Sequence, residues 1–290
     1  MPPAAVEIRG LVKRFRRFTL GPLDLTVPRG AIYGFVGPNG AGKTTTLDLI
    51  FGMGENDAGT IAVLGHDHRR EELALRRLTG YVSPELNFQP WGRVNGAIRF
   101  VRGFYPTWDE AYCEHLLAMF RVDRDEKIRT LSFGARIKLA LVLALSWRPP
   151  LLVLDEPTVG LDAISKQLIF TELLGAVRDE DRTVLISSHG ISDLERFADH
   201  VGMIKDGRLV FEGAIADIVD RYRLVDATTS GRGAVPDLPG ILVQQRDGDR
   251  CRLVIDRRAA SLDQLSVHGI RPIADVAMTL EDLFVALGRS

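Results

Sequence analysis

The sequence predicts an α/β fold, and three observations support that prediction. Residues 151–154 form a continuous apolar run without alternation, which is typical of a strand covered on both faces, and residues 183–187 predict another buried strand. Residues 165–177, between these strands, have the apolar spacing of a helix. A third apolar run, at residues 31–36, ends in a glycine-rich turn, and a helix is expected from Lys43 onward.

Further elements are expected on either side of this alternation. Residues 6–8 and 23–27 alternate apolar and polar side chains, which predicts half-buried strands near the start of the chain. In the middle of the chain, Asp109 lies at the expected start of a helix, where an acidic side chain is favourable. Residues 134–146 predict a second helix, which ends before two consecutive prolines.

The pattern of residues changes after about residue 220. Before that point, Asp206-Gly207 between two apolar runs predicts a β-hairpin. Residues 1–220 are therefore expected to form a main domain, and residues 221–290 a small appended accessory domain. Within the latter we expect a loop at residues 228–233, strands at 241–243 and 253–255, and a helix at 280–287.

Composition and charge narrow the classes of function. The chain has 290 residues, and its 46% hydrophobic content rules out wholesale disorder. The 37 basic and 38 acidic residues give a net charge of −1, so there is no global field to hold a polyanion. The most apolar stretch, residues 139–147, is far shorter than the roughly 20 residues of a membrane span. The N-terminus lacks the layout of a signal peptide, and two cysteines fit a reducing cytosol, so any membrane role is expected to come through a partner.

One glycine-rich segment matches the phosphate-binding pattern G-x-x-x-x-G-K-[ST]. Its residues are Gly37, Pro38, Asn39, Gly40, Ala41, Gly42, Lys43 and Thr44. Glycines let backbone N–H groups converge on phosphate oxygens, and the following helix points its positive N-terminal end at the same place. We expect Lys43 to reach the β and γ phosphates, Thr44 to ligate Mg²⁺, and Thr45 to complete the nucleotide contact. The alternative is a plain glycine-rich turn, and the position between a strand and a helix argues against it.

Two carboxylates follow the buried strand at residues 151–154. Asp155 is expected at the edge of the sheet beside the phosphate site, where it would hold Mg²⁺ directly or through water. Glu156, one residue later, is expected to orient or deprotonate the attacking water. A strand that ends in an exposed acidic turn is the alternative, but the nearby lysine loop favours catalysis.

The segments around these motifs resemble the ATP-binding subunit of an ABC transporter, over about residues 5–220. Residues 131–135 read Leu-Ser-Phe-Gly-Ala, where the family carries its Leu-Ser-Gly-Gly-Gln signature, so Phe133 and Ala135 depart from the pattern. The resemblance implies that Ser132 and Gly134 reach the γ-phosphate bound to a second subunit. A helix N-cap at Ser132 is the alternative, and the two roles are compatible.

Other motifs follow in the family's order. Asp162, in Gly160-Leu161-Asp162, corresponds to the family's D-loop at the dimer interface. His189 ends the next predicted strand, where the family has a histidine that senses the γ-phosphate. The segment around Phe15 resembles the stretch whose aromatic residue stacks on adenine, with Phe18 as the second choice; a solvated basic loop is the alternative.

The resemblance also implies an architecture. This is a P-loop NTPase (RecA-like) core with an antiparallel β subdomain and an inserted α-helical subdomain at about residues 86–147, plus a small α+β C-terminal extension. The helical subdomain would receive a short helix of the membrane subunit in a groove. Its aromatic side chains are expected to be mostly core, with one or two lining the groove: Phe88, Trp91, Phe100, Phe104 and Trp108.

Two local features depart from a simple transfer of the family pattern. After Gly80-Tyr81-Val82 the family usually carries a glutamine that contacts Mg²⁺ and the attacking water. Here Glu85 and Gln89 are the candidate replacements. Residues 66–68, His-Asp-His, have too few ligands at suitable spacing for a metal site, so a surface turn is expected there.

The sequence therefore predicts an ATPase that uses ATP and Mg²⁺ to power a separately encoded polytopic membrane subunit. Resemblance to the bacterial ABC-2-type exporter branch favours export, by closure and opening of a dimer that is a homodimer or a heterodimer. The expected place is cytoplasmic, on the inner face of the cell membrane through the partner, with no nucleic acid bound. Two alternatives stay open: a soluble ABC ATPase acting on ribosomes or nucleic acid, and a non-hydrolysing regulatory half of a heterodimeric transporter.

Overall fold

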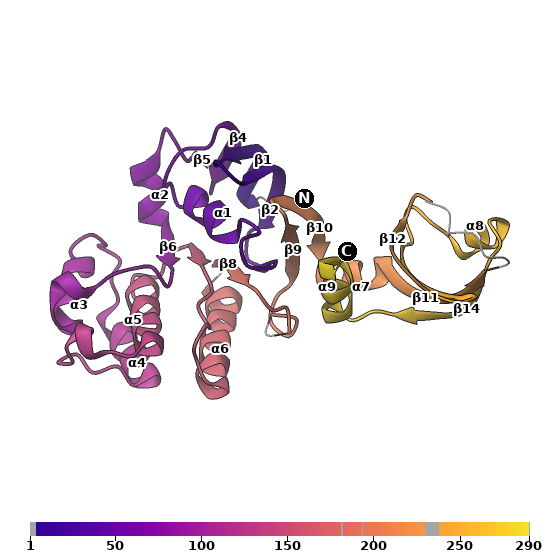
Figure 1. Cartoon of the computed structure of the whole chain (residues 1–290). Helices are drawn as coiled ribbons and strands as arrows, with labels where there is room; N and C mark the ends of the chain where they lie inside the picture. Colours follow the sequence, from indigo (N-terminus) through magenta and orange to yellow (C-terminus); the bar gives the residue numbers. More distant parts are fainter. Residues whose placement is uncertain (1–3, 181, 193, 230–237, 290) are drawn as a thin grey trace. The chain divides into compact units, whose positions relative to one another are not determined.

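The computed structural model describes residues 4–180, 182–192, 194–229 and 238–289 (Figure 1). The chain divides into two compact units. The first consists of residues 1–189 and 197–211, and the second of residues 190–196 and 212–290. The domain boundary expected after residue 220 stays a prediction. In the described ranges, no helix has both the length and the apolar character needed to cross a bilayer.

A six-stranded sheet with the strand order β10-β9-β3-β8-β7-β6 forms the centre of the first unit. Its strands are β3 (Ile32–Val36), β6 (Thr79–Val82), β7 (Leu151–Leu154), β8 (Thr183–Ser188), β9 (His200–Lys205) and β10 (Arg208–Ala214). β3 pairs in parallel with β8 and β9, and β7 pairs in parallel with β6 and β8, so these five strands end at the same edge. Every residue of β7 and β8 is buried, which explains their lack of alternation and confirms the two predicted buried strands.

The hairpin predicted at Asp206-Gly207 is confirmed, since β9 and β10 are neighbours in the sheet and these two residues join them. Asp206 has a φ of 49° and Gly207 a φ of 76°. A two-residue type I′ turn matches the twist of the flanking strands and requires a positive φ at both of its central residues. Asp and Gly adopt this conformation more readily than most residues do.

A second, antiparallel sheet of the first unit has the order β2-β1-β4-β5. Its strands are β1 (Ala4–Arg14), β2 (Thr19–Pro28), β4 (Ala58–Val63) and β5 (His66–Asp67). The two alternating segments predicted at residues 6–8 and 23–27 lie within β1 and β2 and pair directly, with Ile8 opposite Leu25. The alternation arises because one face of this sheet is buried.

The surface turn expected at residues 66–68 is only partly right, because a turn begins at His68 but its side chain is not at the surface. His66 and Asp67 form β5, and His68 is buried at 3% exposure with its Nδ1 3.2 Å from the carbonyl oxygen of Ile61. Burial lowers the pKa of His68, which favours the neutral imidazole. His68 therefore begins the turn after β5 with its side chain packed inward against β4.

Helix α1 (Lys43–Ile50) packs against residues of both sheets. Leu47, Leu49 and Ile50 belong to one buried cluster with Ile8 of β1 and Phe35 of β3. Burial of each such side chain contributes about 1.5–3 kcal/mol, so the start of α1 is fixed firmly after β3. The first unit also contains α2 (Glu72–Leu78) and α6 (Ala163–Glu180).

The segment between β6 and β7 is helical, as the resemblance implied. It contains η1 (Gln89–Trp91), α3 (Val94–Arg102), α4 (Glu110–Phe120), η2 (Ile128–Thr130) and α5 (Phe133–Leu145). Figure 1 shows α3, α4 and α5 gathered as one group. The predicted role of Asp109 is confirmed, because its side chain accepts a hydrogen bond of 2.9 Å from the Tyr112 N–H and caps α4.

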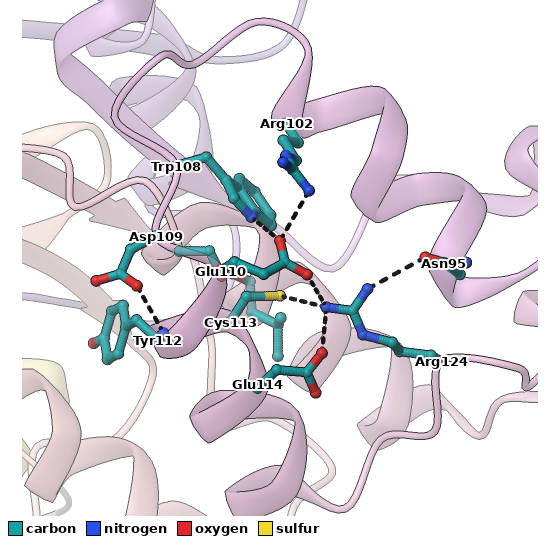
Figure 2. A network of polar contacts seen from close by, with 11 residues as sticks. Asn95, Arg102, Trp108, Asp109, Glu110, Tyr112, Cys113, Glu114 and Arg124 are labelled. Carbon is teal, nitrogen blue, oxygen red and sulfur yellow. Dashed lines mark hydrogen bonds and ion pairs between the residues drawn. The ribbon is translucent and has the colours of Figure 1, made fainter.

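A polar network around Arg124 joins these helices (Figure 2). The Arg124 guanidinium lies 2.5 Å from a Glu110 carboxylate oxygen and 2.6 Å from one of Glu114, both on α4. It also donates to Asn95 on α3 at 3.3 Å, while Glu110 accepts a hydrogen bond from the Trp108 indole. One planar donor therefore fixes α3, α4 and the loop after α4 relative to one another.

The aromatic side chains of this helical segment are not mostly core, so that expectation is wrong. Phe100 and Phe104 are 46% and 60% exposed, and Phe88, Trp91 and Trp108 are only partly buried. Phe88, Trp91, Phe100 and Phe104 form a continuous ladder with successive ring centroids 4.7–5.9 Å apart. These rings pack against one another at the surface. Aliphatic residues such as Ile98 fill the interior of the segment instead.

The second unit contains a four-stranded sheet with the order β12-β13-β11-β14. Its strands are β11 (Tyr222–Thr229), β12 (Ile241–Asp247), β13 (Arg250–Asp256) and β14 (Ile270–Ala277), and its helices are α7 (Ile215–Arg221), α8 (Leu262–Val267) and α9 (Leu280–Arg289). The predicted strands at 241–243 and 253–255 and the predicted final helix are confirmed. The loop expected at 228–233 is wrong for residues 228–229, which end β11, and its other residues lie outside the described ones.

Candidate functional site

The turn after β3 can be formed only with its glycines. A Cβ on Gly37 would lie 2.2 Å from the carbonyl oxygen of Ile204, so no side chain fits there. Gly40 and Gly42 have φ values of 78° and 106°, in the left-handed region that other residues avoid. Gly42 is also the N-cap of α1, so the loop delivers its backbone N–H groups to the helix start. Ala41 is buried and is held by the Gly207 N–H on its carbonyl oxygen.

Lys43 is buried at 6% exposure, and its ammonium group folds back over this turn. It donates hydrogen bonds to the carbonyl oxygens of Gly37 at 2.7 Å and Pro38 at 3.3 Å. Its Nζ also lies 3.4 Å from Oε1 of Glu156. The ammonium group therefore contacts two neutral carbonyls and one carboxylate, and it places a positive charge beside the turn.

The acidic residues after β7 are held by a hydroxyl from the neighbouring strand β8. Ser187 Oγ donates to Asp155 Oδ1 at 2.6 Å and accepts from the Glu156 N–H at 2.9 Å. Thr44 Oγ1 of α1 donates to the other oxygen of Asp155 at 2.8 Å. Both oxygens of the buried Asp155 carboxylate are thus fixed, one on each side, by hydroxyl groups.

Glu156 has a φ of 46°, which is uncommon for a residue other than glycine and requires support from its surroundings. Its Oε2 lies 2.8 Å from Nδ1 of His189, just beyond the end of β8, and its Oε1 faces Lys43. The strained backbone aims this carboxylate between a lysine and a histidine. Strain of this kind is frequent at functional sites, where it fixes a reactive group.

These side chains converge on one cavity of about 500 Å³ in the first unit. Most of the sequence-predicted nucleotide residues line it. The lining residues are Phe15, Phe18, Asn39, Gly40, Gly42, Lys43, Thr44, Thr45, Pro84, Glu156, Val159 and His189. The cavity has a basic and backbone-rich side, an acidic side and an aromatic side, as a nucleoside triphosphate requires. Phe15 is 47% exposed there, and its ring is 6.2 Å from that of Phe18.

Five predicted nucleotide residues do not line this cavity. Gly37 and Ala41 belong to the glycine-rich turn itself, and the other three lie elsewhere in the chain. Ser132, Gly134 and Asp162 lie around the start of α5 and just before α6. Ser132 Oγ accepts a hydrogen bond of 3.2 Å from the Ala135 N–H, so the alternative role as an N-cap is confirmed. A Cβ on Gly134 would lie 2.7 Å from Leu161, so these segments pack closely together.

Asp162 caps the start of α6. Its two carboxylate oxygens accept hydrogen bonds from the Ser165 N–H at 2.8 Å and the Ser165 hydroxyl at 2.9 Å. The N–H of Ser165 in particular lowers the pKa of Asp162, so this side chain is an anion at neutral pH. Its position places a negative charge at the base of α6 on the same side as Ser132.

Sequence reasoning missed several residues of the cavity and its supports. Ser187 lies near the end of β8, and only its place before Ser188-His189 pointed to it. Pro84 lines the cavity, whereas Glu85 and Gln89, the candidate replacements for the family glutamine, are not among the lining residues. Both are exposed, so the cavity wall at this point is a proline ring.

A buried hydrogen bond behind the cavity was also unforeseen. Tyr81 OH donates to Asp48 Oδ1 at 2.6 Å, which ties β6 to α1 one turn after Thr44. Burial raises the pKa of Asp48, and the nearby charges of Asp155 and Glu85 act in the same direction. Burial and the bond to Asp48 also raise the pKa of Tyr81, so its hydroxyl stays a donor.

The donor set at the start of α1 suits Mg²⁺. A threonine hydroxyl and an aspartate carboxylate are hard oxygen ligands, and Thr44 and Asp155 lie within hydrogen-bond distance of each other. Mg²⁺ commonly takes only one or two protein ligands and completes its shell with phosphate and water. Across the described ranges, no group of three or more His, Cys, Asp or Glu side chains forms a separate metal site.

Comparison with protein families and characterised sequences gives one consistent result. A family described as "ABC transporter" matches residues 20–159. ABC transporter ATP-binding protein YtrB of Bacillus subtilis (strain 168) is 30% identical over 218 residues, 75% of this chain and 74% of that protein. Daunorubicin/doxorubicin resistance ATP-binding protein DrrA of Streptomyces peucetius is 32% identical, covering 100% of this chain and 90% of that protein.

Solved structures agree with the sequence relatives. An ATP-binding subunit of an ABC transporter superposes with a TM-score of 0.68 and 26% identity, covering 74% of this chain and 92% of that one. A dimeric post-hydrolysis state of the ATP-binding cassette MJ0796 with ADP and Pi gives a TM-score of 0.65 over 72% of this chain and 98% of that one, at 21% identity, which shows likeness of fold.

Proposed function

Because this chain belongs to the ABC transporter family, as an ATP-binding subunit and ATPase, we propose that its Lys43 loop holds the triphosphate of Mg²⁺-ATP and Glu156 activates the attacking water. The observation that supports this most strongly is the convergence of Lys43, Thr44, Glu156 and His189 on one cavity. The cavity is large enough for a nucleotide, and it holds both a positively charged binding site for phosphate and a carboxylate that can act as a base.

Each residue has a distinct role in this proposal. Lys43 exchanges its carbonyl contacts for the β and γ phosphate oxygens, and the N–H groups of the glycine-rich turn bind the same phosphates. Glu156 accepts a proton from the water that attacks the γ-phosphate, since its carboxylate is aimed into the cavity. His189 donates a hydrogen bond to the γ-phosphate, and its contact with Glu156 keeps it at the end of β8.

Thr44 and Asp155 would hold the Mg²⁺ ion. The ion would supply charge neutralisation at the β and γ phosphates, and the protein's task is to hold its two ligands rigidly. Ser187 serves that task from β8, because its hydroxyl fixes the second Asp155 oxygen. Phe15 stacks on the adenine ring, since it is the exposed aromatic side chain at the edge of the cavity.

Ser132, Gly134 and Asp162 support a second proposal, the closing of two subunits on two ATP molecules. They lie outside the cavity of their own chain, at the N-terminal ends of two helices, which favour anions. A cassette with the same fold is dimeric in its post-hydrolysis state. Each subunit's α5 start would therefore cap the γ-phosphate in the other subunit, and hydrolysis would release the pair.

The names of two relatives support a proposal for the membrane partner and the direction of transport. DrrA is named for drug resistance, and Nod factor export ATP-binding protein I of Burkholderia lata, 36% identical over 74% of this chain and 72% of that protein, is named for export. We infer an exporter whose membrane subunit is a separate chain, which holds this ATPase at the cytoplasmic face of the membrane. The partially exposed aromatic side chains of the helical segment are the candidate contact for that subunit.

The decisive experiment compares Glu156→Gln with the wild-type chain. The variant is expected to bind Mg²⁺-ATP with unchanged affinity, to hydrolyse it at least about 100-fold more slowly and to accumulate as a dimer in size-exclusion chromatography with ATP. Glu55→Gln, which changes an exposed carboxylate outside the cavity lining, is the matched control and should retain wild-type turnover.

The alternatives give different outcomes. A wild-type chain without measurable turnover, alone and with its partner, would support the non-hydrolysing regulatory half. Turnover that rises with ribosomes or RNA, without co-purification of a polytopic membrane protein, would support the soluble ATPase. Full activity of Glu156→Gln would contradict the assignment of the base.

A further inference from the structure

The second unit contains a cavity of about 530 Å³ that the ATPase reaction does not use. Its walls come from all four strands of the sheet in that unit. The lining residues are Asp226, Ala227, Gln245, Arg246, Asp247, Arg250, Cys251, Arg252, Ile273 and Ala274. This volume is comparable to that of the nucleotide cavity, so a small molecule of similar size fits.

The cavity lies on the face of the sheet opposite the buried core of this unit. Val225, Ala227, Cys251 and Leu253 belong to that core together with Leu265 of α8. Since side chains alternate along a strand, Asp226 and Arg252 point to the other face. Their neighbours in the register are Gln245 on β12 and Ala274 on β14, so one row of four residues crosses the sheet and forms the floor.

The second row of this floor places Arg250 of β13 opposite Asp247 of β12, and the two side chains, both among the described residues, are not joined by an ion pair. Arg250 is two residues before Arg252 on β13, on the same face, so the two guanidinium groups start about 7 Å apart. Arg252 is neutralised by Asp226, with 2.9 Å between its Nε and the carboxylate. The ion pairs of this unit, as far as the structure describes it, join Arg221 to Asp256, Arg223 to Asp275 and Arg252 to Asp226, and none includes Arg250.

The charged residues of the lining give the cavity a net positive charge. Three arginines and two aspartates line the cavity, so its formal charge is +1. The Gln245 amide adds neutral donors on one side, and Ile273, which is 63% exposed, adds an apolar edge on the other. Guanidinium groups in pairs are well suited to carboxylate or phosphate, whose oxygens they bind through two parallel hydrogen bonds.

We propose that this cavity binds a small organic anion that carries a carboxylate or phosphate group, held by Arg250 and the row of Arg252 and Gln245, with its apolar part against Ile273 and Ala274. The site lies wholly within the second unit and contains none of the residues assigned to ATP. The bound anion is therefore a ligand distinct from the nucleotide, and the site stands whether or not the proposed roles of Lys43 and Glu156 hold.

The test is calorimetric titration of the full chain with citrate in one arm and inorganic phosphate in the other. Both arms use the Lys43→Ala background, so that phosphate binding at the nucleotide cavity is weakened. We expect saturable binding of at least one probe with one site per chain, and the stronger of the two distinguishes a carboxylate site from a phosphate site. Arg250→Ala should weaken that affinity by about tenfold or more, because a charge-assisted contact is lost.

Two further variants make the outcome decisive. Arg257→Ala removes an exposed arginine of the same unit that does not line the cavity, and it should leave the affinity unchanged. Ala274→Trp fills the floor without altering any charge and should abolish binding, with an unchanged melting temperature as the check on folding. Failure of both probes to bind saturably, or an equal loss in Arg250→Ala and Arg257→Ala, would overturn the proposal.

Discussion

Ser187 and Asp155 are joined by a hydrogen bond of 2.6 Å between neighbouring parallel strands, and both side chains are buried. The same hydroxyl accepts the N–H of Glu156 at 2.9 Å. A single oxygen atom at the end of β8 therefore sets the position of the carboxylate proposed for Mg²⁺ and of the backbone that carries the proposed base. Its loss would affect both at once.

Ser187→Ala is expected to reduce kcat by about 10–100-fold, as is typical when a group that orients a metal ligand is removed. The Mg²⁺ concentration needed for half-maximal turnover should rise, because one Asp155 oxygen loses its fixed donor. Steady-state ATPase assays over a range of Mg²⁺ concentrations measure both effects. Ser187→Thr keeps the hydroxyl and suits a strand, so it should restore most of the activity; equal loss in both variants would contradict this role.

Lys43→Ala is expected to weaken ATP binding by about 10–100-fold, because the concentrated charge beside the turn is removed. Equilibrium binding of a fluorescent ATP analogue measures the change. Lys127→Ala, an exposed lysine in the helical segment, is the control for a general effect of charge and should bind normally. An unchanged affinity in Lys43→Ala would refute the phosphate cradle.

Phe15→Ala and Phe18→Ala should have different consequences. Phe15 is half exposed at the edge of the cavity, so its loss should weaken ATP by about 1–3 kcal/mol and leave inorganic tripolyphosphate unaffected. Phe18 packs against the core cluster, so its loss should mainly lower the melting temperature. Competition binding with ATP and tripolyphosphate, together with thermal unfolding, separates the two effects. Equal weakening of both ligands by Phe15→Ala would exclude adenine stacking.

The Arg221–Asp256 pair should make the second unit sensitive to acid. The guanidinium contacts both carboxylate oxygens, at 2.9 and 2.5 Å, and lowers the pKa of Asp256. A lowered carboxyl pKa adds stability above the unfolded pKa of about 3.9 and loses it as pH falls through the folded value. Arg221→Ala should therefore destabilise this unit by about 1–3 kcal/mol at pH 7, and by much less once the pH has fallen below the lowered pKa of Asp256.

Urea unfolding at several pH values, followed by a probe in the second unit, measures this difference. Arg223→Ala is a useful comparison, because its contact with Asp275 is a single ion pair of 2.7 Å in a more exposed place. Arg223→Ala should lower the free energy of unfolding at neutral pH by less than Arg221→Ala does. A constant difference between Arg221→Ala and the wild type across the whole pH range would show that the ion pair contributes nothing.

The sequence was sufficient for the parts of the fold and site that local chemistry determines. The apolar runs of β7 and β8, the Asp-Gly hairpin and the cap at Asp109 each follow from the properties of a few adjacent residues. The convergence of the Lys43 turn, Glu156 and His189 on one cavity follows from parallel strands that end at one edge. The roles assigned to these residues stay predictions.

The errors come from strand pairing and side-chain packing that the pattern of adjacent residues does not determine. His68 is buried because β5 pairs with β4, and no pattern around residue 68 indicates that pairing. The exposed aromatic ladder depends on which residues of α3 turn inward, and Ile98 and Ala97 take those places. β11 has a mixed sequence in which Val225 and Ala227 belong to the core, so its alternation is short, and the composition of its last two residues predicted a loop.

Phe133 lies directly against Gly160, where a Cβ would be 3.0 Å from the ring and where φ is 71°. Acceptable replacements at these two positions therefore depend on each other: an alanine at 160 demands a smaller residue at 133, and a bulky 133 demands glycine at 160. With the ordinary family glycine at position 133 the steric limit on position 160 disappears, whereas its φ of 71° still favours glycine. Paired libraries should therefore show that position 133 controls only the size of the residue accepted at position 160.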